Sequence, residues 1–106
     1  MKALINGFEW DFHFVDKDNE ELDGAWGICL NYKQTILVSN YLSPQLMREC
    51  LIHEITHATL LTQGRGGAQK FSLEELCEFV GFNGTKILDV ADKVIEDYFS
   101  KTKRAN

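Results

Sequence analysis

The sequence predicts an α+β fold in which a three-stranded, mainly antiparallel sheet packs on three helices. Two patterns lead to this prediction. Apolar and polar residues alternate in the first part of the chain, as in half-buried strands, and apolar residues recur at helical spacing in the second part. The third observation is size. A chain of 106 residues has room for one modest hydrophobic core, so we expect a single domain over residues 1–106.

The three predicted strands cover residues 8–16, 24–30 and 35–38. The first is the clearest, because aromatic residues occupy every second position and polar residues lie between them. The second contains tryptophan, isoleucine and cysteine, and the third is a β-branched run. The links between the strands are short, which favours an antiparallel meander. The aromatic face of the first strand consists of Phe8, Trp10, Phe12 and Phe14, and its polar face of Glu9, Asp11 and His13.

The first predicted helix runs from about Pro44 to Gln63. Ser43 is a typical N-cap residue, and proline is favoured at the first helical position, where its missing N–H would have no helical partner. The run Gly64-Arg65-Gly66-Gly67 provides residues that tolerate positive φ, which is typical of a helix C-terminus.

Two further helices are predicted after the glycine-rich turn. Ser72 and Glu75 form an S-x-x-E capping box, which predicts a helix that continues to about Val80. The run Gly81-Phe82-Asn83-Gly84 then predicts a break. Residues 85–100 place apolar side chains at helical spacing and therefore predict a terminal amphipathic helix.

Composition excludes several classes of function. With 11 Lys and Arg against 16 Asp and Glu, the net charge of -5 gives no positive field for direct nucleic-acid binding. No apolar stretch approaches the roughly 20 residues of a membrane span, and no secretory leader is recognisable. The three cysteines, Cys29, Cys50 and Cys77, lack a C-x-x-C pair, which argues against disulfides and a thiolate zinc site. We therefore expect a cytoplasmic protein.

The run His53-Glu54-Ile55-Thr56-His57 is an H-E-x-x-H motif within the first predicted helix. Residues four apart lie about 6 Å apart along a helix and within about 40° around it, so both imidazoles can reach one metal ion. Glu54 is displaced by about 60° from His57, which makes it a base for a water molecule rather than a ligand. With 3 histidines and 9 glutamates in the chain, chance gives this motif with a probability below about one in a hundred. The pattern predicts a zinc site.

A catalytic zinc site needs a third protein ligand. Glu74, Glu75 and Glu78 on the next predicted helix are the candidates, and the alternative is a solvated acidic face. We favour Glu75, because it lies closest of the three to the apolar stripe of its helix and turns inward most easily. His13 is expected to be exposed to solvent and Cys50 to be a small core residue, so neither is included among the ligands.

The motif, preceded by Leu51-Ile52 and followed by Ala58, resembles that of the ImmA/IrrE-like zinc metallopeptidases of bacteria, mobile elements and phages. The resemblance covers residues 24–82 and includes an acidic helix after the motif helix. It implies a minimal, gluzincin-like zincin fold, with His53, His57 and a glutamate at position 75 as zinc ligands and Glu54 as catalytic base. The family often has Glu-Ala-Asn or Glu-Ala-Asp at its third ligand, where this chain has Glu75-Leu76-Cys77.

The expected activity is hydrolysis of peptide bonds in a protein or peptide substrate. Zinc would lower the pKa of a bound water molecule to about 7, and Glu54 would transfer its proton to the leaving amine. We expect an extended substrate to pair with an edge strand over Thr35–Ser39. Candidate oxyanion stabilisers are Tyr32, Tyr41, His13 and Arg65. The alternative is a zinc-containing, non-catalytic phage or mobile-element protein that binds a partner protein. The sequence does not indicate an oligomeric state.

Overall fold

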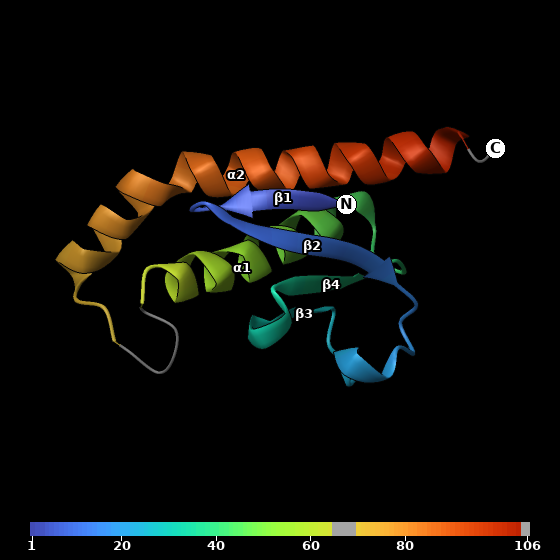
Figure 1. The fold of residues 1–106 in the computed structure, drawn as a ribbon, viewed down its shortest axis with the longest axis horizontal. Coiled ribbons are helices and arrows are strands. Elements are labelled where there is room, and N and C mark those ends of the chain that lie inside the picture. The colour runs from blue at the N-terminus through green and yellow to red at the C-terminus, as the bar shows by residue number, and fades with distance from the viewer. Residues whose placement is uncertain (65–69, 105–106) are drawn as a thin grey trace.

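In a computed structural model, residues 1–64 and 70–104 are described, and they form a four-stranded sheet with two long helices (Figure 1). The predicted α+β class is confirmed. The elements are β1 (Lys2–Ile5), β2 (Phe8–Val15), η1 (Glu20–Leu22), β3 (Gly27–Leu30), η2 (Asn31–Lys33), β4 (Thr35–Ser39), α1 (Pro44–Thr62) and α2 (Leu73–Arg104).

The sheet has the strand order β1-β2-β4-β3 and is mixed. β1 and β2 form a hairpin through Asn6 and Gly7, which both have positive φ, as a tight hairpin turn requires. β2 and β4 are parallel, and β3 and β4 are antiparallel. The prediction of a three-stranded meander is therefore wrong in two respects, because β1 adds a strand and β4 lies between β2 and β3.

The core lies between the aromatic face of β2 and the two helices. Trp10 and Phe12 are buried, as the alternation in the sequence predicts. α1 contacts β1, β3 and β4, while α2 contacts α1 and β1. The fully or almost fully buried helix residues are Leu51, Ile55 and Ala58 from α1 and Ala91 and Val94 from α2. α1 therefore packs against the sheet on one side and against α2 on another.

The ends of α1 agree with the sequence signals. The Ser43 hydroxyl accepts a hydrogen bond from the Leu46 N–H at 3.3 Å, and Pro44 is the first helical residue. The helix ends at Thr62, one residue before the predicted end, and Gly64 follows with a φ of 74°. Arg65, Gly66 and Gly67 lie outside the described residues.

α2 is one continuous helix, so the break predicted at residues 81–84 is absent. Gly81 and Gly84 do not have positive φ. Asn83 is buried, and its amide donates to the Phe79 carbonyl at 3.0 Å while its oxygen accepts from the Gln63 amide at 2.8 Å. The first of these bonds is local to α2 and the second is tertiary, and together they support a helical conformation in a sequence of low helix propensity. Figure 1 shows that α2 changes direction along its length.

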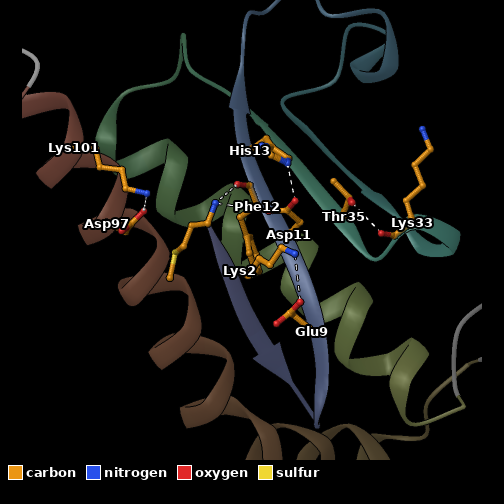
Figure 2. Close-up of polar contacts among 10 residues, drawn as sticks. Lys2, Glu9, Asp11, Phe12, His13, Lys33, Thr35, Asp97 and Lys101 are labelled. Atoms are coloured by element: carbon orange, nitrogen blue, oxygen red, sulfur yellow. Dashed lines mark hydrogen bonds and ion pairs between the residues drawn. The ribbon is translucent and has the colours of Figure 1, made fainter.

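The polar face of β2 points away from α1. Figure 2 shows His13 and Asp11 on this face, with the His13 Nε2 atom 3.1 Å from the Asp11 carboxylate. Nearby, Lys2 and Glu9 lie 3.5 Å apart as an ion pair between β1 and β2. The side chain of His13 is about half exposed. The prediction that His13 faces solvent is confirmed, and its place on the opposite face of the sheet separates it from α1.

Candidate metal centre

Three side chains of the H-E-x-x-H motif converge on α1. One ligand atom from each of His53, Glu54 and His57 can be chosen so that all three lie within 4.8 Å of one another. Both imidazoles are exposed, and Glu54 between them is only 7% exposed. Among the described residues, this is the group of histidine, cysteine and acidic side chains that can hold a metal ion.

The two imidazoles fit the geometry of a shared metal ion. Their ring centroids are 4.9 Å apart, and the rings are inclined by 70°. Two imidazoles bound to one tetrahedral zinc ion through bonds of about 2.0 Å have centroids about 5 Å apart. Two imidazole nitrogens and a neighbouring carboxylate are also a donor set that zinc accepts. The residues present therefore fit a metal ion of this type.

Glu54 occupies a different environment from the histidines because it turns toward the sheet. Burial raises the pKa of its carboxyl, while positive charge on His53 and His57 opposes that shift. Two thiols share this environment. Burial, and then the negative charge of Glu54, raises the pKa of Cys29 to about 12 and that of Cys50 to about 11. A carboxyl whose proton affinity is increased in this way is suited to accept a proton near neutral pH.

Glu75 does not belong to the group formed by the motif residues. Its carboxylate accepts a hydrogen bond from the Ser72 N–H at 3.2 Å, and its own N–H donates to the Ser72 hydroxyl at 3.1 Å. The predicted capping box is thereby confirmed. Together with Glu78, Glu75 lines a cavity of about 220 Å³ beside Gln63, at the C-terminal end of α1.

The packing of α2 explains this separation. Arg48 of α1 forms an ion pair with Asp92 of α2, with Nε 2.8 Å from Oδ1. Nine residues separate Arg48 from His57, which places them about 180° apart around the helix axis. This ion pair places the part of α2 around Asp92 on the flank of α1 opposite the histidines. Glu75 as a zinc ligand stays a prediction. Glu74 and Glu78 are exposed on the same helix.

The other candidate residues lie elsewhere. Tyr32 and Tyr41 are exposed, and the Tyr41 ring lies under the ammonium group of Lys17, 4.5 Å from its centroid. Arg65 lies outside the described residues. Cys50 is a buried core residue, as predicted, and the three cysteines are free thiols.

One prediction about the site is wrong, and one feature of the site was not predicted. The strand predicted as an edge, Thr35–Ser39, is central, so the edge strands are β1 and β3, and both contact α1. Gly27, at the start of β3, lies against α1: a Cβ atom there would lie 2.5 Å from the Cys50 sulfur and 3.4 Å from Glu54 Cγ. A glycine within an expected strand is a signal of such close approach.

Comparison with known proteins provides no family. No family model matches the chain, and no curated protein or solved structure matches it significantly. The resemblance to ImmA/IrrE-like enzymes therefore rests on the motif, whose three residues the structure brings together. No described helix is long and apolar enough to span a membrane.

Proposed function

We propose that this protein is a zinc-dependent metallopeptidase that cleaves peptide bonds in a protein substrate. The observation that carries the proposal is the grouping of His53, Glu54 and His57, in which a buried carboxyl lies beside two exposed imidazoles. A structural zinc site is usually closed by four protein ligands and has no use for an adjacent base. The unusual burial of Glu54 favours a chemical role for its carboxyl.

Each motif residue has a distinct role in this proposal. His53 and His57 hold the metal ion through ring nitrogens on the exposed flank of α1. When bound, zinc supplies a Lewis acid that polarises the scissile carbonyl and makes water more acidic. Glu54 accepts the proton of the attacking water and transfers it to the leaving amine. Its raised pKa assists the first of these transfers.

The free edge of β3 is the proposed substrate-binding surface. The Ser39 N–H donates to the Trp26 carbonyl at 2.8 Å, so Trp26 and Ser39 form a hydrogen-bonded pair. Because such pairs alternate along an antiparallel ladder, Gly27 and Cys29 direct their N–H and C=O groups away from β4. An extended peptide can pair with these groups next to Glu54.

The third ligand is proposed to come from the acidic start of α2, with Glu75 favoured over Glu74 and Glu78. Its present capping role means that coordination would require the first turns of α2 to move around the end of α1. Metal analysis of Glu75→Ala, with Glu96→Ala as a control on the same helix, tests this assignment. Unchanged zinc affinity in Glu75→Ala excludes it.

The test of the main proposal combines metal content with activity. Purified wild-type protein should contain zinc, and His53→Ala and His57→Ala should lose it, whereas His13→Ala should retain it. With a library of unstructured peptides as substrate, Glu54→Gln should lose activity and keep the metal. Glu49→Gln makes the same change at an exposed position of α1 and should remain active. Zinc-loaded wild type without peptidase activity contradicts the proposal.

A specific observation favours a second function, in which the protein binds a partner without cutting it. The start of α2 carries exposed apolar side chains, Leu73, Leu76 and Val80, at helical spacing. These residues are a surface on which a partner protein can dock. A stoichiometric partner that stays intact, with Glu54→Gln fully functional, would support this alternative.

A further inference from the structure

Gly27 lies at the closest approach between the sheet and the motif helix. A Cβ atom built on Gly27 would lie 2.5 Å from the Cys50 sulfur and 3.0 Å from the Leu37 carbonyl oxygen. The first distance is shorter than any real contact of a Cβ atom. The same Cβ would lie 3.4 Å from Glu54 Cγ, in ordinary van der Waals contact. Gly27 therefore occupies a space that has no room for a side chain.

Backbone conformation does not explain the glycine. Among the described residues, the glycines with positive φ are Gly7, Gly24 and Gly64, and Gly27 is not one of them. Its place in the regular register of β3, opposite Val38, is one that any residue can adopt. Glycine costs conformational entropy within a strand. The remaining reason for a glycine at position 27 is the close approach to the Cys50 sulfur and the Leu37 carbonyl oxygen, beside Glu54.

Glu54 is held by packing rather than by hydrogen bonds. No hydrogen bond from a described residue reaches its carboxylate, and its charged partners are the two histidines. Glu54 lies four residues, about one helical turn, after Cys50 on α1, so both side chains lie against the same part of β3. The position of the carboxyl therefore depends on the shape of the surface that Gly27 and Cys50 present to it.

We infer that Gly27 is a positioning residue for Glu54: the missing side chain allows β3 and Cys50 to pack so that the Glu54 carboxyl lies beside the two imidazoles. The inference rests on the proposed function, because it assigns Gly27 to the base of that reaction. It extends the site beyond the motif to the strand that presents the substrate. A displacement of about 1 Å in a catalytic group can reduce a rate by about 100-fold.

The experiment is substitution of Gly27 by alanine. The new methyl group must displace the Cys50 sulfur, which packs one helical turn before Glu54, while the histidines lie on the exposed flank of α1 and are not contacted. We expect kcat to fall by about 10- to 100-fold, with KM changed by less than about 3-fold. Zinc affinity, measured by competition with a chromophoric chelator, should stay within about 2-fold of wild type.

A compensating variant separates positioning from general damage. Cys50→Ala removes the sulfur that the new methyl group would strike. The double variant Gly27→Ala with Cys50→Ala should recover kcat to within about 3-fold of Cys50→Ala alone. Gly81→Ala makes the same substitution where a Cβ would meet nothing within 4 Å, and it should leave kcat unchanged. If Gly27→Ala does not fold, the double variant is compared directly with Cys50→Ala.

A second readout does not depend on peptide cleavage. In protein loaded with Co²⁺, we expect the absorption spectrum to change with pH, and we expect the midpoint of this change to respond to the position of Glu54. We expect Gly27→Ala to shift the midpoint and the double variant to restore it. Wild-type kcat and midpoint in Gly27→Ala overturn the inference, and so does failure of the double variant to recover either. If wild type cuts no peptide, the proposed function fails, and the Co²⁺ midpoint still decides the role of Gly27.

Discussion

Substitution of Gly81 and Gly84 by alanine is a direct test of the continuity of α2. Both glycines lie in the first half of one 32-residue helix, and neither has positive φ. A Cβ atom on Gly81 would meet nothing within 4 Å, and one on Gly84 would lie 3.7 Å from Val80 Cγ1, an ordinary contact. The added methyl groups therefore introduce no clash.

The expected gain follows from helix propensity. Glycine within a helix is less favourable than alanine by about 0.8–1.0 kcal/mol, because the unfolded chain loses more freedom on folding. The two substitutions should together raise the free energy of unfolding by about 1–2 kcal/mol. For a domain of this size, each kcal/mol raises the melting temperature by about 4–8 °C.

The assay is thermal and urea unfolding followed by circular dichroism at 222 nm, a wavelength chosen because it reports helix content. Gly64→Ala is the matched control, since Gly64 follows α1 with a φ of 74°. Alanine is strained in that conformation, and this variant should lose about 1 kcal/mol. A loss of stability in Gly81→Ala and Gly84→Ala would mean that these glycines adopt a conformation that alanine disfavours. The continuous helix would then be wrong.

Three further predictions concern the candidate site. Burial raises the pKa of Glu54 in the folded protein, so its contribution to stability is fully present below the unfolded pKa and is lost as pH rises through the folded pKa. In metal-free protein, Glu54→Gln should therefore raise the urea midpoint at neutral pH, and the gain should disappear in acid. Iodoacetamide should modify exposed Cys77 first and Cys29 slowly, because the pKa of Cys29 is raised to about 12. Since the charge of Glu54 contributes to this shift, Glu54→Gln should speed the modification of Cys29. Mass spectrometry of the labelled peptides measures both rates. Zinc at about 100 times its Kd should stabilise wild type by about 2.7 kcal/mol in thermal unfolding, and His53→Ala and His57→Ala should show no such gain.

Features encoded by neighbouring residues were predictable from the sequence. The spacing of His53 and His57 fixes their common helix face, and the cap at Ser43 fixes where that helix begins. Ser72 and Glu75 likewise form the capping box that their spacing predicts. In each case the interaction spans three or four residues, so no knowledge of the tertiary structure is needed.

Features that depend on distant residues were not predictable in the same way. The sequence links β3 and β4 correctly as neighbours, but nothing local indicates that β2 pairs with β4 in parallel. The run at residues 81–84 has the composition of a break, and it is helical because Gln63 bonds to Asn83 from another element. The strand β1 has only four residues, and its sequence Lys-Ala-Leu-Ile shows no alternation of polar and apolar residues to reveal it.

The same distinction applies within the site. A helical repeat places Glu54 beside His57, but it does not reveal that Glu54 is buried or that Gly27 lies against it. It also does not reveal which flank of α1 is covered by α2, and this determines how far Glu75 lies from the histidines. Long-range packing thus decides both the environment of Glu54 and the position of Glu75 relative to the histidines.

The small size of the chain is not an argument against peptidase activity. A shaped cleft requires several walls, which 106 residues provide with difficulty. An edge strand instead binds an extended peptide through backbone hydrogen bonds, and these require only a free edge of suitable length. β3 provides this edge beside the motif helix. The backbone N–H and C=O groups of Gly27 and Cys29 point away from β4, and Gly27 lies next to Glu54. Under the proposed function, one strand and one helix would be sufficient to bring a peptide bond to Glu54. Selectivity among substrates would then come from conformation, because unfolded or extended segments can reach the strand and folded ones cannot.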